Sequence, residues 1–164
     1  MGPDAFRTAG IADALKGLGH QVEDLGNLSA GPYAADAEGD PVYARNETIG
    51  WTKELSQAAE NAMEQGVPIF LGGDHSLSLG SVAGVANYAA RVERPLFVLW
   101  LDAHTDFHTP ITTDSGNLHG TPVGYFTGRE DFDGFPKVQN PVPQENVCMI
   151  GLRSVDTPER LALE

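Results

Sequence analysis

The chain contains the stretch Leu96-Phe97-Val98-Leu99-Trp100-Leu101-Asp102-Ala103-His104-Thr105-Asp106-Phe107-His108, in which six apolar residues lead into a polar cluster. A short apolar run that ends this abruptly predicts a buried strand, with the polar side chains at its carboxyl end. Asp102, His104 and Asp106 are spaced two residues apart, so on extended backbone they would share one face. Two carboxylates and an imidazole on one face indicate a divalent metal site, because a cation gathers anionic oxygens and neutral nitrogens. For this motif alone, a solvated strand end is the alternative interpretation.

A second apolar run ends in the same manner. Residues 67–71 predict a strand, which is followed by Gly72-Gly73-Asp74-His75-Ser76 and by a helix over residues 77–91. The carboxyl ends of parallel strands meet at one edge of a sheet, so we expect His75 to lie near Asp102. A glycine-rich turn could instead bind a phosphate, but the spacing of a P-loop and its lysine are absent from this turn.

Helical and extended patterns alternate along the chain. Apolar residues at helical spacing predict helices over residues 5–18, 45–65 and 77–91. Short apolar runs predict strands over residues 21–25, 67–71, 96–101 and 147–152. This alternation indicates an α/β fold in which helices cover a parallel sheet, within a single domain over residues 1–164.

The composition limits the class of protein. The 164 residues are enough for one domain with a core, and a hydrophobic content of 41% is ordinary for a globular protein. The formal net charge of −13 argues against nucleic acid and anionic membranes as partners. We expect no membrane span and no export signal, because no apolar run has the required length or position. Cys148 is the single cysteine, which excludes an internal disulfide and favours a reducing, cytoplasmic location.

Polar segments later in the chain add further candidate residues. The loop Ser115-Gly116-Asn117-Leu118-His119-Gly120 could supply substrate contacts and a proton-transferring histidine if it lies beside the metal. The last predicted strand runs into Ile150-Gly151-Leu152-Arg153 and then reaches Asp156 and Glu159, again at a carboxyl end. Residues 131–133 contain a second pair of spaced aspartates, but no strand precedes them and we interpret them as a surface loop.

Taken together, the motifs around His75, Asp102, Ser115 and Arg153 resemble those of the arginase branch of the ureohydrolase family, in the same order and over essentially the whole chain. The resemblance implies an arginase/deacetylase-like fold of three layers, α/β/α, around a central and mostly parallel sheet. It also implies hydrolysis of the guanidinium group of L-arginine to ornithine and urea at a site with two Mn²⁺ ions. The two ions would bridge and deprotonate one water for attack on the guanidinium carbon. The family tends toward trimers or hexamers, so a homo-oligomer is expected.

The resemblance also implies roles for individual residues. The implied metal ligands are His75, Asp102, His104 and Asp106, with Asp102 bridging the two ions. His119 would transfer a proton to the leaving amine. The implied substrate contacts are His108, Ser115, Asn117, Asp156 and Glu159, the last two near the α-amino group.

Two departures from the family pattern bear on the function. His108 stands where arginases usually carry an asparagine, although histidine can still donate a hydrogen bond to the substrate carboxylate. The family has one strand before the start of this chain and later D-x-D ligands beyond Glu164, so we expect an incomplete fold that is nearly inactive alone. The alternatives to arginine hydrolysis are a sister ureohydrolase that acts on agmatine or a guanidino acid, and a non-catalytic truncated chain.

Overall fold

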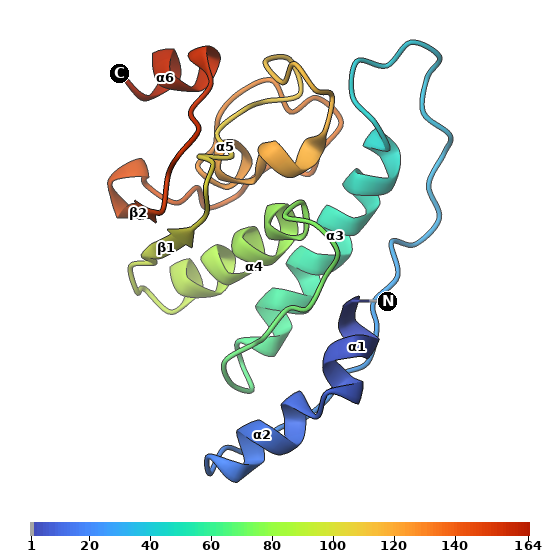
Figure 1. The fold of residues 1–164 in the computed structure, drawn as a ribbon, viewed down its shortest axis with the longest axis vertical. Coiled ribbons are helices and arrows are strands. Elements are labelled where there is room, and N and C mark those ends of the chain that lie inside the picture. Colours follow the sequence, from blue (N-terminus) through green and yellow to red (C-terminus); the bar gives the residue numbers. More distant parts are fainter. Residues whose placement is uncertain (1) are drawn as a thin grey trace.

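Two long helices that lie side by side form one layer of the molecule (Figure 1). The computed structural model describes residues 2–164, in which α3 spans Arg45–Ala62 and α4 spans Leu77–Arg91. Gly84 lets the two helices approach closely, because a Cβ atom at this position would lie 2.2 Å from the carbonyl oxygen of Ser56. The sheet packs against α4, the second helix of this pair.

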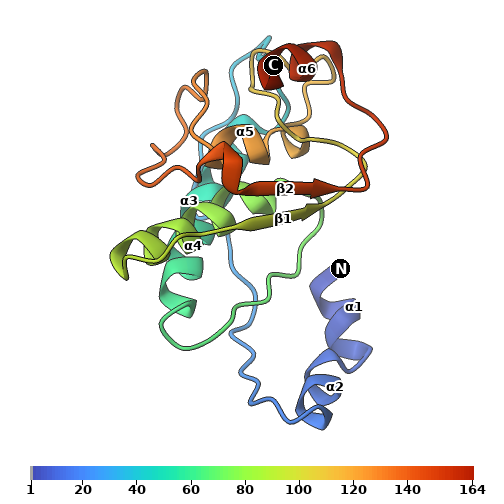
Figure 2. The ribbon, with the colours of Figure 1, turned by 90° about the vertical axis from the view of Figure 1, so that its left-hand side faces the viewer.

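A two-stranded parallel sheet lies against α4 (Figure 2). The strands β1 (Val98–Leu101) and β2 (Val147–Ile150) pair in register along their whole length. The inner face of the sheet packs into an apolar cluster that includes Ala86 of α4 and the buried Trp100 and Phe126. The outer face exposes Leu99, Leu101, Cys148 and Ile150. Within residues 2–164, helices therefore cover only one face of the sheet.

The N-terminal segment forms two short helices, α1 (Gly2–Thr8) and α2 (Ile11–Gly17), in place of the single helix expected over residues 5–18. Gly10 separates them, since its left-handed φ of 84° interrupts the right-handed helical path. The two helices lie at one end of the molecule, away from the sheet (Figure 1).

Two of the four expected strands do not form. Residues 21–25 and 67–71 have no regular structure, and among residues 2–164 the only strands that pair are β1 and β2. A strand is stable only when its backbone groups are paired with a neighbour, and Val67 is 91% exposed with no such neighbour. The apolar pattern is therefore wrong about pairing in these two segments, although it predicts α4 at its observed bounds.

Short helices complete the chain beyond β1. They are the 3-10 helices η1 (Leu118–Gly120) and η2 (Gln144–Asn146), and the α-helices α5 (Pro122–Phe126) and α6 (Thr157–Leu163). Asp156 begins α6 as its N-cap, in a capping box with Glu159. No helix within residues 2–164 is both long and apolar enough to cross a membrane. The architecture is α/β, as expected.

Candidate metal centre

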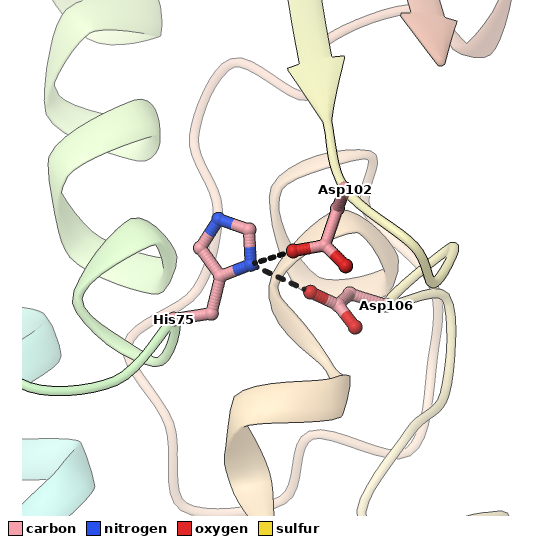
Figure 3. Close-up of side chains that lie close together, drawn as sticks. All are labelled: His75, Asp102 and Asp106. Carbon is pink, nitrogen blue, oxygen red and sulfur yellow. Dashed lines mark ion pairs between the residues drawn. The ribbon is translucent and has the colours of Figure 1, made fainter. Parts of the chain in front are cut away.

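His75, Asp102 and Asp106 converge at the carboxyl end of β1 (Figure 3). Nδ1 of His75 lies 3.1 Å from Oδ2 of Asp102 and 2.9 Å from Oδ2 of Asp106. Asp102 directly follows β1, Asp106 lies in the loop beyond it, and His75 lies in the turn before α4. One imidazole nitrogen and two carboxylates form a donor set that fits a hard divalent cation such as Mn²⁺.

The fourth predicted ligand, His104, lies at the margin of this cluster. Its side chain is 61% exposed, and its Nδ1 lies 3.3 Å from Oδ1 of Asp102. It does not join the three ligand atoms of His75, Asp102 and Asp106, which lie within 4.8 Å of one another. The backbone N–H of His104 donates to the same Oδ1 at 2.9 Å, so the chain turns immediately after the strand. Asp102 thus presents one oxygen to His75 and the other to His104.

The backbone at Asp106 has an unusual conformation. Its φ of 48° lies in the left-handed region, which few residues other than glycine adopt. Its carbonyl oxygen accepts the backbone N–H groups of Val123 at 2.9 Å and Gly124 at 3.3 Å. These amides belong to the first turn of α5, where no intrahelical acceptor exists. The N-terminus of α5 therefore holds the loop that carries Asp106.

The charges around His75 shift its protonation. The hydrogen bond to Asp106 raises the pKa of His75 above its usual value, against burial, which lowers it. Burial raises the pKa of Asp102, but the backbone N–H of His104 and the charge of His75 outweigh it, and the net shift is downward. A cation at this place would compete with the His75 proton, because only the neutral imidazole is a ligand.

Trp100 orients His75 from inside the fold. The two rings are stacked, with centroids 4.1 Å apart and an angle of 13° between their planes. Trp100 is buried in β1, and its Nε1 is the buried side-chain nitrogen without a hydrogen-bond partner in the described part of the chain. Sequence reasoning missed this contact, because alternation along a strand does not report what approaches its inner face from another segment.

A second cluster brings together three of the predicted substrate-binding residues. Nε2 of the buried His108 lies 3.3 Å from Oδ2 of Asp156 and 3.8 Å from Oε2 of Glu159. The other ring nitrogen lies 3.1 Å from Oγ1 of Thr112. His108, which stands where arginases usually carry an asparagine, thus lies beside Asp156 and Glu159. These are the two acids expected near the α-amino group of the substrate.

The loop before η1 carries the remaining predicted residues. Ser115, Asn117 and His119 are all exposed to solvent. Oγ of Ser115 accepts the backbone N–H of Asn117 at 3.2 Å, so the loop is shaped by its own polar groups. The structure does not bring these three side chains into either cluster of acids and histidines.

Comparison with protein families matches residues 1–164, the whole chain, to the Arginase family. The chain belongs to the arginase family. It is 52% identical over 166 residues to the arginase of Brucella melitensis biotype 1, a match that covers 100% of this chain and 54% of that protein. It is 37% identical to the human protein named Arginase-2, mitochondrial, over 99% of this chain and 47% of that protein.

Solved arginases share the fold of this arginase-family chain. The crystal structure of arginase from Bacillus cereus matches it with a TM-score of 0.84 at 31% identity, over 99% of this chain and 54% of that one. An arginase structure from Bacillus subtilis matches with a TM-score of 0.83 at 35% identity, over 99% and 55% of the two chains. These likenesses confirm the expected α/β fold, and the chain spans about half the length of the relatives it matches.

Proposed function

We propose that the whole protein hydrolyses the guanidinium group of L-arginine to ornithine and urea at a centre with two Mn²⁺ ions. The observation that carries this proposal is the convergence of His75, Asp102 and Asp106, whose ligand atoms lie within 4.8 Å of one another. Membership of the arginase family supports a hydrolase, and the similar proteins from Brucella and from human are named arginases.

The proposed ligands to the metal are His75, Asp102, His104 and Asp106. Asp102 suits the bridging position because its two oxygens face different histidines, at 3.1 Å and 3.3 Å. The exposed side chain of His104 is free to turn toward a cation beside Asp102. Divalent cations held there would lower the pKa of water, so that hydroxide is available at neutral pH.

Expulsion of the amine from the guanidinium carbon needs a proton, and we assign its delivery to His119. An imidazole exchanges protons near neutral pH, which suits both donation and recovery of the proton. The exposure of His119 supports this role, since solvent can return the proton after each turnover.

The amino-acid end of the substrate would be held by polar side chains outside the metal cluster. They are His108, Ser115, Asn117 and Asp156. The family resemblance also implies Glu159, whose carboxylate is buried against the loop that carries Asp106. Asp156 has a half-exposed carboxylate that can receive an α-ammonium group, and its neighbour His108 can donate to a carboxylate. Agmatine has no carboxylate for the donors His108, Ser115 and Asn117 to bind, so these three side chains favour arginine as the substrate.

A sister ureohydrolase that acts on agmatine or a guanidino acid is the second candidate function. The contact of His108 Nε2 with Asp156 at 3.3 Å favours agmatine, because it competes with a contact between His108 and a substrate carboxylate. From the family resemblance we also propose that the whole protein is a cytoplasmic homo-oligomer, a trimer or a hexamer.

The substrate assignment can be tested by steady-state kinetics. We expect the Mn²⁺-loaded whole protein to release urea from L-arginine with a higher kcat/KM than from agmatine. Chelation followed by addition of Mn²⁺ serves as the control for metal dependence. Equal or faster turnover of agmatine would contradict the arginase assignment, and no urea from either substrate in a Mn²⁺-loaded protein would support a non-catalytic role.

A further inference from the structure

We propose that Glu159 is a positioning residue, whose carboxylate holds the two residues on either side of Asp106 and so fixes this aspartate in its left-handed conformation. The inference rests on the proposed function only in taking Asp106 as a metal ligand. It gives Glu159 a different task from the substrate contact that the family resemblance implies.

One oxygen of Glu159 makes both contacts with the loop. Oε1 accepts the hydroxyl of Thr105 at 2.5 Å and the backbone N–H of Phe107 at 3.0 Å. Thr105 and Phe107 flank Asp106 in the chain, so the three-residue segment is held at both ends by a single acceptor. We call this pair of hydrogen bonds the Glu159 clamp.

The other oxygen of Glu159 ties the clamp to a helix. Oε2 accepts the backbone N–H of Asp156 at 3.1 Å, which completes the capping box of α6. A single carboxylate therefore joins the loop after β1 to the N-terminus of α6. Movement of the loop would break hydrogen bonds at both places.

The carboxylate of Glu159 is shielded from solvent together with these hydrogen-bond partners. Glu159 is 3% exposed and Thr105 is fully buried. A buried carboxylate needs hydrogen-bond donors, and here two backbone N–H groups and one hydroxyl supply them. A substrate ammonium could reach this carboxylate only by displacing part of the clamp.

Phe107 is held from a second side as well. The guanidinium of Arg129 donates to the carbonyl oxygen of Phe107 and lies over its ring, 4.7 Å from the centroid. Both backbone polar groups of Phe107 are thus engaged, its N–H by Glu159 and its carbonyl by Arg129. The residue that follows Asp106 therefore has little freedom to change its backbone angles.

The clamp matters because Asp106 would not adopt this conformation by preference. The left-handed region is unfavourable for L-residues, although aspartate tolerates it better than most. The side chain reaches Nδ1 of His75 at 2.9 Å from this backbone conformation. Outer groups that fix a ligand commonly govern metal affinity, so loss of the clamp should weaken the metal site.

The test uses two variants of the whole protein that disturb the contacts of Glu159 by different routes. Glu159→Gln replaces the carboxylate with an amide, whose NH2 group opposes one of the three donors that now surround Glu159. Thr105→Val removes the hydroxyl in a side chain of nearly the same shape. Thr105→Ser keeps the hydroxyl and is the matched control, and Glu145→Gln makes the same chemical change at an exposed glutamate on η2. Three properties are measured for each variant and for the unchanged protein. They are the Mn²⁺ affinity of the metal-free protein, the rate of hydrogen exchange at the Phe107 amide, and kcat and KM for L-arginine.

We expect Glu159→Gln and Thr105→Val each to weaken Mn²⁺ binding by about 10-fold and to speed exchange at Phe107. The double variant should be little worse than the more affected single one, since both substitutions act on the same group of hydrogen bonds. The two controls should resemble the unchanged protein. If Glu159→Gln does not fold, the comparison of Thr105→Val with Thr105→Ser decides alone.

Two results would overturn the clamp. One is an unchanged Mn²⁺ affinity and exchange rate in Thr105→Val. The other is a raised KM for L-arginine in Glu159→Gln with unchanged Mn²⁺ affinity, which would make Glu159 a substrate contact. If the unchanged protein binds no Mn²⁺ and releases no urea, the proposed function fails. The Glu159 clamp can still be tested in that case, because hydrogen exchange at Phe107 needs no metal.

Discussion

Asp106 combines a left-handed backbone with a nearly buried carboxylate. For most L-residues the left-handed conformation costs about 1–2 kcal/mol per residue, and an unpaired buried carboxylate would cost considerably more. The contact with His75 at 2.9 Å supplies a partner for the charge, and the amides of α5 satisfy the carbonyl. Strained residues persist where the surrounding structure holds them, and they concentrate at functional sites.

His119 offers a prediction about a single side chain. In the whole protein, His119→Ala should lower kcat by roughly 10²–10⁴ if it transfers a proton in the rate-limiting step. Bound Mn²⁺ should barely change, because His119 is not among the proposed ligands. Urea formation and metal content are measured on the same sample. Parallel loss of metal and activity would place His119 among the ligands instead.

The residues of the site differ in how far the sequence predicts their positions. The proximity of His75 to Asp102 follows from the expected parallel topology, although residues 67–71 do not form the strand that this expectation assumes. The position of His104 does not, since spacing by two residues assumes extended backbone, and the chain turns directly after β1. The contacts of Thr105 with Glu159 and of Trp100 with His75 join distant segments, and no local pattern reports them.

The helix pair α3 and α4 allows a prediction at the level of elements. A Cβ at Gly84 would lie 2.2 Å from the carbonyl oxygen of Ser56 and 2.7 Å from Cβ of Ala59. Gly84→Ala should therefore lower the free energy of unfolding by about 1–3 kcal/mol, through overpacking of the helix contact. Gly17→Ala is the matched control, because nothing lies within 4 Å of that position and alanine favours a helix.

Chemical denaturation of the whole protein and of both variants measures this difference. An unchanged stability for Gly84→Ala would contradict the close approach of the helices. We expect the Gly17→Ala variant to have a higher free energy of unfolding than the Gly84→Ala variant.

Element prediction succeeds where local pattern and packing agree. The helical pattern over residues 77–91 coincides with α4, whose small residues also pack against α3. The helix expected over residues 5–18 is interrupted by the left-handed backbone of Gly10, and the spacing of apolar residues does not reveal this conformation. The helices α5 and α6 have only 5 and 7 residues, too few to show a period. Contacts with α4 support α5, and a capping box supports α6.

Residues 2–164, taken as a whole, expose an apolar surface on the outer face of the sheet formed by β1 and β2. Leu99 is 59% and Leu101 is 67% exposed, and Phe97 and Ile150 are also exposed. A contiguous apolar face of this kind is unusual on a soluble monomer. The strands also have unpaired edges within residues 2–164, where another chain could pair.

Residues 1–164 alone should therefore aggregate or bind a hydrophobic dye. They should also hold Mn²⁺ weakly and release little or no urea, because they offer only four proposed ligands for two ions. Leu99→Glu should reduce dye binding by the isolated chain. Leu161→Glu on α6 is the control, because Leu161 is 69% exposed, more than Leu99, but lies outside the sheet face. Dye fluorescence, calorimetric titration with Mn²⁺ and a urea assay test these expectations. A monodisperse chain that binds two ions tightly and releases urea would contradict them.

The Glu159 clamp also has a consequence for the order in which the protein is made. Glu159 lies 54 positions after Thr105, so a ribosome completes the loop that carries Asp106 well before it adds α6. Closing a longer loop costs more conformational entropy, although the cost grows slowly with length. During synthesis the proposed metal ligands His75, Asp102 and Asp106 are therefore made before the carboxylate that holds the loop around Asp106. We therefore expect the geometry at Asp106 to become fixed only after α6 has been made and has docked against the loop.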